Sequence, residues 1–262
     1  MRHYVLPALL LFYLVLWIGG IASYLLHAGP PADMLWTAPA FLLLAGAILL
    51  ATSPVFEIKW LLLGGIMGFS AEVVGVYSSV IFSAYHYTDV LQPTLKEVPL
   101  VMISAWMVLI GYVRQMLKGF SRSKWLTVLY ASTWMTAIDL VIDPLAGGVL
   151  GYWRWSENGM YYGIPAHNFL GWFVVSFLIF LFLRGPVIKN VWAERTGLSI
   201  ILFFTLLSWI FGLILPGIIG LVLFSLHVIV PRANNTGRPC SRVSETPLQT
   251  PFSLRRRIHE TF

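Results

Sequence analysis

Residues 198–230 read LSIILFFTLLSWIFGLILPGIIGLVLFSLHVIV, and this run contains no Asp, Glu, Lys or Arg. A helix needs about 20 apolar residues to cross a bilayer, so the run is too long for one span. Gly212, Pro216, Gly217 and Gly220 interrupt its middle, and residues of these types favour reversals over continued helix. The run therefore predicts two short spans joined by a tight turn.

Apolar segments of spanning length also fill most of the preceding chain. They lie at 4–26, 34–53, 60–82, 98–117, 125–142 and 164–183. The whole chain is 58% hydrophobic and only 11% charged, whereas soluble domains carry about 25% charged residues. We therefore expect an all-α polytopic bundle of about eight transmembrane helices, with seven spans as the alternative.

The positions of the basic residues orient this bundle. With eight spans and the N-terminus inside, every Lys and Arg lies on the inner side except Lys96 and Arg154. An excess of basic residues marks the cytoplasmic side, so both termini are predicted to be cytoplasmic. The net charge of +6 thus reflects topology and contact with membrane lipids, and no nucleic-acid partner is expected.

Two regions of different composition are expected. Residues 1–231 form the transmembrane domain, and residues 232–262, rich in Asn, Thr, Pro, Ser and Arg, form a disordered basic cytoplasmic tail. The only cysteine, Cys240, lies in this tail, which excludes an internal disulfide framework.

Three carboxylates interrupt the apolar spans, and ionisable residues inside a membrane suggest function. Glu72 shares a helical face with small residues such as Gly68 and Gly75, so it is expected to point into the bundle, as a catalytic group or as a structural one. Asp139 and Asp143 lie four residues apart on a polar helical stripe. Glu72 and Asp139 are predicted at similar depth, facing one cavity. Pro144 is expected to end the helix of the aspartates near the outer boundary.

Aromatic residues are concentrated in the segments predicted on the outer side. They form either an interfacial belt or the wall of a cavity for a long apolar ligand. The candidates for substrate contact are Tyr85, Tyr87, Trp106, Tyr152, Trp153, Trp155, Tyr161, His167, Asn168 and Trp172.

Several kinds of chemistry lack their sequence motifs. There is no Cys-x-x-Cys, His-Glu-x-x-His or Walker-type loop, so neither a metal nor a nucleotide cofactor is expected. Asp139-x-x-x-Asp143 is only one acidic motif, whereas membrane prenyltransferases use two. Inward carboxylates among aromatic residues suit the protonation of an alkene, because a buried carboxylic acid donates a proton and aromatic faces stabilise the resulting cation.

Two blocks of sequence carry a family resemblance. The first contains Gly68-x-x-x-Glu72-x-x-Gly75, Tyr85-x-Tyr87-Thr-Asp89 and Val98-Pro-Leu with Trp106. The second, which is more specific, contains Asp139-x-x-x-Asp143-Pro144, Gly151-Tyr-Trp-x-Trp155 and Gly159-x-Tyr161-Tyr-Gly163-Ile-Pro165-x-x-Asn168-Phe-x-Gly171-Trp172. Together they resemble the CruF-type carotenoid 1′,2′-hydratase family over residues 60–185. The family has Pro-Phe-Gly where this chain has Ile81-Phe82-Ser83.

The resemblance implies an enzyme of the bacterial or archaeal cell membrane that needs no cofactor. It would add water to the terminal double bond of an acyclic carotenoid such as lycopene, γ-carotene or bisanhydrobacterioruberin, beside other enzymes of the pathway. We expect Glu72 or Asp139 to be the acid and Asp143 to orient the water. The alternatives are a carotenoid end-group cyclase, a carotenoid-binding protein without turnover, and a proton-coupled transporter.

Overall fold

A computed structural model describes residues 2–121, 123–183, 185 and 187–236, with side chains between residues 5 and 229. Within these ranges the chain forms an all-α bundle, as predicted. The eight α-helices are α1 (Arg2–His27), α2 (Thr37–Thr52), α3 (Val55–Ser78), α4 (Val101–Met116), α5 (Lys124–Asp143), α6 (Ala166–Phe182), α7 (Val191–Ile210) and α8 (Ile214–Thr236).

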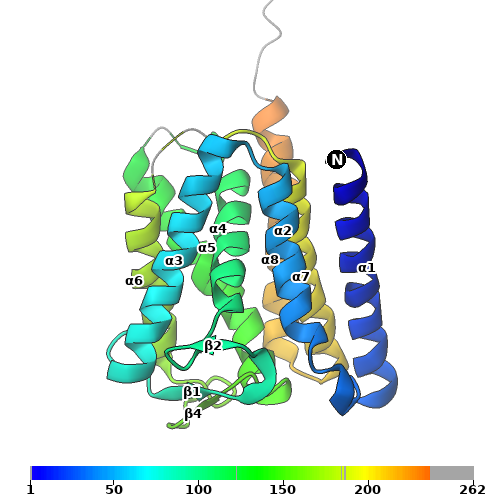
Figure 1. Ribbon diagram of the computed structural model, residues 1–262. Helices are drawn as coiled ribbons and strands as arrows, with labels where there is room; N and C mark the ends of the chain where they lie inside the picture. Colours follow the sequence, from blue (N-terminus) through cyan, green and yellow to red (C-terminus); the bar gives the residue numbers. More distant parts are fainter. Residues whose placement is uncertain (1, 122, 184, 186, 237–262) are drawn as a thin grey trace, which may run out of the picture.

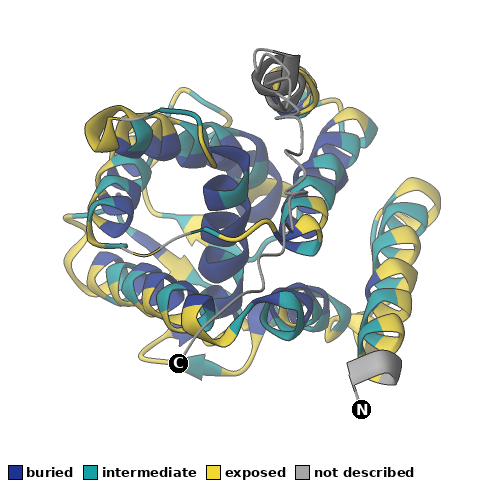
Figure 2. Ribbon diagram, turned by 90° about the horizontal axis from the view of Figure 1, so that it is seen from above, coloured by how far each residue is buried: buried dark blue, intermediate teal, exposed yellow. Residues whose placement is uncertain are grey.

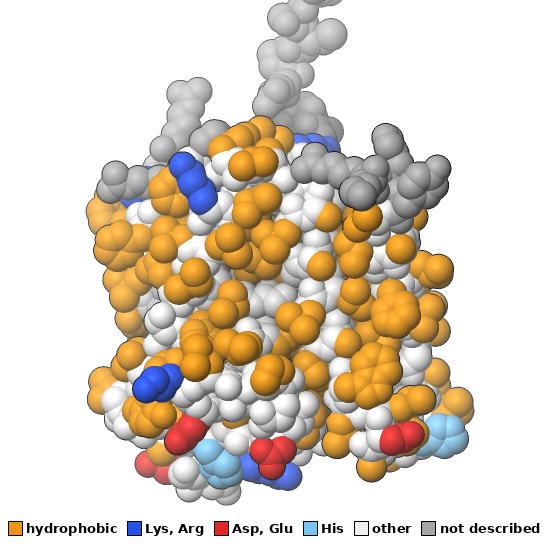
Figure 3. Space-filling model, in the orientation of Figure 1, with side chains coloured by type: hydrophobic (Ala, Val, Ile, Leu, Met, Phe, Trp, Pro, Cys, Tyr) orange, Lys and Arg blue, Asp and Glu red, His pale blue; other side chains and the backbone are white. Residues whose placement is uncertain are grey.

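Helix length and composition fit a multi-pass membrane protein. Five segments of the described chain are long and apolar enough to cross a membrane, and α4, α6 and part of α8 are shorter apolar helices. A continuous belt of apolar side chains covers the face seen in Figure 3, and the coloured charged groups lie toward its two ends. Lipid provides no water for backbone groups, and helices satisfy these groups internally.

Helices α7 and α8 form the hairpin predicted for residues 198–230. Helix α7 ends at Ile210, Gly212 adopts a left-handed φ of 69°, and α8 begins at Ile214. Glycine takes this conformation without the steric cost that a Cβ atom imposes. The start of α1 and the far end of α8 consequently lie on one side of the bundle (Figure 1). That this side is cytoplasmic stays a prediction.

Helix α4 is the centre of the bundle. It packs against α2, α3, α5 and α7, and nearly all of its residues are buried. Helix α1 lies at the edge, packs mainly against α2 and α7, and exposes most of its surface (Figure 2). Tyr13 and Trp17 of α1 bond Ser199 of α7 across this interface. These two aromatic side chains therefore lie on the packing face of α1.

Two small β-ribbons close the end opposite the termini (Figure 1). Strand β1 (Tyr85–Tyr87) pairs antiparallel with β4 (Trp153–Trp155), and β2 (Thr94–Leu95) pairs with β3 (Val98–Pro99). The first ribbon places Tyr85 opposite Trp155 and Tyr87 opposite Trp153. Two loops that are far apart in the sequence thus meet under the helices.

The α-helical part of the polar span ends at Asp143, as predicted, and Pro144 is its C-cap residue. A π-helical turn, η3 (Pro144–Val149), continues the chain from there, and Leu150 N–H donates to Leu145 O at 2.7 Å. Proline has no N–H to donate to the carbonyl of Leu140, which accepts a hydrogen bond from the Tyr161 hydroxyl group instead. The third span begins at Val55 and ends at Ser78, not at 60 and 82. Helix α8 extends to Thr236, and residues 237–262 of the expected tail, with Cys240, lie outside the described residues.

Candidate active site

Glu72 is held by three hydrogen-bond donors from two other segments. The side chain is 5% exposed, and its Oε2 atom accepts hydrogen bonds from the hydroxyl groups of Tyr85 and, at 3.1 Å, Tyr87. Its Oε1 atom accepts a hydrogen bond from Trp106 Nε1 at 3.1 Å. Burial and the nearby Glu72 carboxylate raise the pKa values of the Tyr85 and Tyr87 phenol groups well above the usual value for tyrosine. Both phenols therefore remain protonated donors.

Glycines of α3 make this arrangement possible. A Cβ atom on Gly68 would collide with the indole of Trp106, and one on Gly75 would lie 2.6 Å from the ring of Phe82. The spacing Gly68–Glu72–Gly75 puts all three on one helical face. The motif thus lets bulky aromatic groups reach the backbone of α3 on both sides of the carboxylate.

Besides Glu72 on α3, the site contains a pair of carboxyl groups on α5, those of Asp139 and Asp143. Both are 1% exposed. The Asn168 amide nitrogen, from the first turn of α6, donates to Asp139 Oδ2 at 2.9 Å and to Asp143 Oδ2 at 2.7 Å. Asp143 Oδ1 also accepts a hydrogen bond from Trp153 Nε1 at 2.7 Å. One amide therefore bridges two carboxyl groups that one helical turn brings together.

Aromatic rings surround these acids. The Trp106 and Trp172 rings are stacked with centroids 4.3 Å apart. The Tyr85 and Trp155 centroids are 5.2 Å apart, and the rings of the neighbouring pair in the ribbon, Tyr87 and Trp153, are 5.8 Å apart. The β1–β4 ribbon therefore builds a cavity wall, which supports the second of the two interpretations of the aromatic loops.

A small cavity of about 20 Å³ lies between the two acidic elements. Its lining is Glu72, Phe82, Tyr85, Tyr87, Met102, Asp143, Trp153, Trp155, Asn168 and Trp172. A buried water needs about 10–15 Å³ of such space and two or more polar partners, so this cavity has room for one water molecule.

Asp139 lines a separate cavity of about 60 Å³. This second cavity is almost entirely apolar and shares Met102, Trp153 and Trp172 with the first. The prediction that Glu72 and Asp139 face one cavity was thus wrong. The carboxyl group that shares the cavity of Glu72 is Asp143, and Asp139 lies behind the aromatic wall that the two cavities share. Within the described residues, no cluster of three His, Cys, Asp or Glu side chains suits a metal ion.

Seven of the ten predicted substrate-contact residues line the two cavities, and three do not. Tyr161 bonds the carbonyl of Leu140, and exposed His167 bonds that of Val80. Trp106 belongs to the site only through its hydrogen bond to Glu72 and its stack on Trp172. Tyr152 lines the Asp139 cavity. Sequence reasoning missed Met102, although it lies one helical turn before Trp106 and therefore shares its face. It also missed Phe82 as a wall residue, although Phe82 lies in the motif region.

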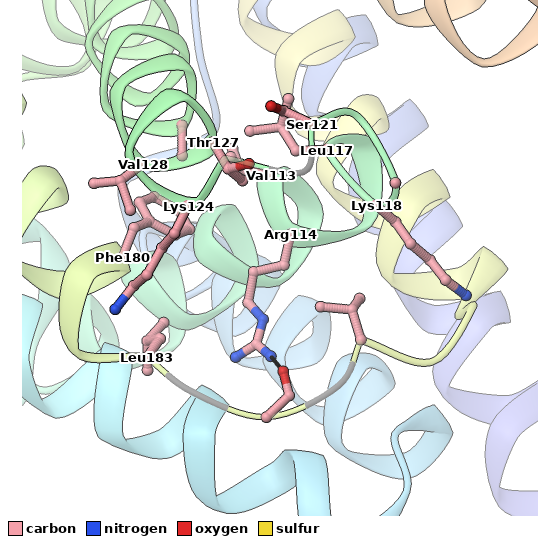
Figure 4. Close-up of a pocket in the computed structure, with 14 residues that line it drawn as sticks. Val113, Arg114, Leu117, Lys118, Ser121, Lys124, Thr127, Val128, Phe180 and Leu183 are labelled. Atoms are coloured by element: carbon pink, nitrogen blue, oxygen red, sulfur yellow. Dashed lines mark hydrogen bonds between the residues drawn. The ribbon is translucent and has the colours of Figure 1, made fainter. Parts of the chain in front are cut away.

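Another cavity, of about 370 Å³, has a different character. It lies between α4, α5 and the end of α6, and its charged lining residues are Arg114, Lys118 and Lys124 (Figure 4). Arg114 donates to the carbonyl of Gly185 at 3.4 Å. Among the described residues that line it there is no carboxylate, so it offers no acid for alkene chemistry.

Comparison with known proteins gives one match. A family model described as carotenoid biosynthesis protein matches residues 37–227, which include every residue of the two carboxyl clusters and their aromatic walls. No curated protein and no solved structure matches the chain. Helix α1 lies outside the matched range.

Proposed function

The chain belongs to the carotenoid biosynthesis protein family, and from this premise we propose that it is a cofactor-independent carotenoid 1′,2′-hydratase. It adds water across the terminal double bond of an acyclic carotenoid end group, as in lycopene or γ-carotene. The reaction takes place in the inner membrane of a bacterium or archaeon, alongside other enzymes of the pathway.

The observation that carries this proposal is the water-sized cavity between Glu72 and Asp143. Hydration needs an acid, a water molecule and a base within reach of one alkene carbon pair. Glu72 and Asp143 both border this space, and most of the remaining wall is made of aromatic rings. The lining supplies all the required groups without a cofactor.

We assign the acid to the Asp139–Asn168–Asp143 cluster. Glu72 already accepts three hydrogen bonds, an arrangement that suits an ionised carboxylate. Asp139 accepts a single one, from an amide that it shares with Asp143. Two adjacent carboxyl groups retain one proton between them more readily than they ionise together. The cluster is thus the better proton donor and Glu72 the better anion.

The reaction balances with water as the only co-reactant. The aspartate cluster gives its proton to one carbon of the terminal double bond, which leaves a tertiary cation on the other carbon. The negative charge of Glu72 and the faces of the aromatic rings stabilise this cation. Water forms the new C–O bond and loses one proton to a carboxylate, and proton exchange returns the cluster to its starting state.

Expression in a lycopene-accumulating bacterial host tests the proposal. Pigments extracted from cells that make the wild-type protein are expected to gain the mass of one or two water molecules. A cyclised product of unchanged mass identifies a cyclase instead. Unchanged pigment with protein present in the membrane identifies a binding protein or a transporter, and it contradicts the proposal.

Glu72→Gln and Asp139→Asn variants test the roles of the carboxyl groups in the same host. Each replaces an acid by an amide of nearly the same shape, and each is expected to lower conversion by about 100-fold or more. Membrane protein levels, measured by immunoblot, are expected to stay near those of the wild type. If both variants remain active, the carboxyl groups do not carry the chemistry.

A further inference from the structure

An apolar groove of about 320 Å³ lies beside the edge helix α1. Its walls come mainly from α1, α2 and α7, and include Phe12, Val15 and Gly19 of α1. No charged side chain lines it among the described residues. The groove is therefore suited to a hydrocarbon and not to a charged or strongly polar ligand.

The groove continues toward the candidate active site. Leu42, Tyr152 and Phe204 line both the groove and the cavity of Asp139. That cavity in turn shares its Met102, Trp153 and Trp172 wall with the water-sized cavity. Three cavities thus adjoin in series from α1 to Glu72, each separated from the next by a few apolar or aromatic side chains.

Tyr152 is one of the side chains that separate the groove from the cavity of Asp139. Its backbone is fixed, because Tyr152 N–H donates to Ala146 O at 2.8 Å and its carbonyl accepts from Thr88 N–H at 3.0 Å. At this point a side chain that is free to change rotamer, and not a backbone segment, separates the groove from the Asp139 cavity. Side-chain rotation of this kind needs no opening of the bundle.

The other end of the series lies at the lipid-facing side of the bundle. Only 6% of the apolar segment of α1 is buried, and Phe12 and Val15 are more than half exposed. A water-insoluble molecule dissolved in the bilayer reaches the groove by moving sideways past α1, without passing through water.

We infer that this groove binds the polyene body of the substrate and admits it from the bilayer, with the reacting end group leading into the cavities of Asp139 and Glu72. The inference rests on the proposed function, because it takes the polyene as the substrate. It makes α1, which lies outside the family match, part of the substrate site. It also means that one end of the polyene reacts at a time.

Gly19 allows a sharp test. It lines the groove, and a Cβ atom placed on it meets no atom within 4 Å, so the backbone at this position accepts a side chain without a steric clash at Cβ. Gly19→Phe is expected to weaken lycopene binding by about tenfold, as judged by the pigment absorbance retained per purified protein in lipid nanodiscs. In turnover, KM rises while kcat stays close to the wild-type value.

Ile18→Phe is the matched control. Ile18 is the neighbouring residue, is 55% exposed and does not line the groove, so lycopene binding is expected to match the wild type. Val15→Trp narrows the groove from the same helix and replaces Gly19→Phe if that variant does not fold, as checked by thermal unfolding.

The outcomes separate this inference from the proposed function. Weaker lycopene binding in the groove variants, but not in Ile18→Phe, supports the inference. If the wild-type protein binds lycopene in this way but forms no hydrated product, only the hydratase proposal fails. Equal binding by Gly19→Phe, Val15→Trp and Ile18→Phe overturns the inference and leaves the groove to lipid acyl chains. Absence of lycopene binding by the wild-type protein overturns it as well.

Discussion

Asn168 links the two aspartates through a single amide nitrogen that donates to both. Its replacement by leucine leaves two buried carboxyl groups without this bridge, and a buried polar group that loses its partner costs about 1–3 kcal/mol. We expect Asn168→Leu to lower the thermal unfolding temperature and to reduce turnover by about 100-fold through misplaced carboxyl groups.

Ser176 provides the control for this variant, two helical turns further along α6. It is fully buried, and its hydroxyl group has no hydrogen-bond partner among the described residues. Ser176→Ala is therefore expected to keep both turnover and unfolding temperature near the wild type. A loss of the same size in both variants would mean that α6 tolerates no change, and that the bridge has no special role.

Sequence reasoning located the buried carboxyl groups but not their hydrogen-bond partners. The burial of Glu72 follows from the small residues on its helical face, and the shared face of Asp139 and Asp143 follows from helical spacing. Their hydrogen bonds depend on how separate helices and loops pack. Trp106 donates to Glu72 across 34 positions of sequence, a contact that no local pattern predicts.

At the scale of elements, the contact between α3 and α4 depends on Gly68, where a Cβ atom would overlap the Trp106 ring. Gly68→Ala is expected to destabilise the protein by about 1–3 kcal/mol, because the indole must move away from Glu72 and from its stack on Trp172. Thermal unfolding and turnover measure the two effects.

Gly148→Ala is the corresponding control, because a Cβ atom on Gly148 in η3 meets no atom within 4 Å. It is expected to unfold at a temperature close to that of the wild type. Equal destabilisation by both substitutions would contradict the role assigned to the close approach of Trp106.

The elements differ in how far local sequence determines them. The α7–α8 hairpin was predictable, because an apolar run too long for one span was interrupted by Gly212, Pro216, Gly217 and Gly220. The turn itself uses only Gly212, whereas Pro216, Gly217 and Gly220 lie inside α8. The π-helical turn after Pro144 was not, since it depends on packing of Leu145 and Ala146 into the core, where they are at most 1% exposed. The β1–β4 ribbon joins segments that α4 and α5 separate in the sequence, and its register follows from tertiary structure.

The topology of the whole molecule predicts a labelling pattern. Cys240 follows α8, outside the described residues, whereas exposed Glu157 lies in the loops at the opposite end. In inside-out vesicles, a membrane-impermeant maleimide is expected to label wild-type protein at Cys240. The variant Cys240→Ser with Glu157→Cys is expected to be labelled only from the outer face.

Labelling of both proteins from the same face would contradict the three crossings by α6, α7 and α8 that separate the two positions. Labelling with the two faces exchanged would keep eight spans and reverse the orientation inferred from the basic residues. The count of helices followed from apolar length, whereas the orientation rests on charge alone.

The β1–β4 ribbon has a consequence for how the protein matures. Glu72 and the donors Tyr85, Tyr87 and Trp106 are all present once α4 has been synthesised, but Trp153 and Asn168 follow only with the loop after α5 and with α6. The half-site around Glu72 is therefore made early and stays incomplete while the later helices enter the bilayer. On the proposed function, the site is complete only late in biogenesis, so a chain released before α6 is inserted carries Glu72 and its donors but lacks the amide that bridges the two aspartates.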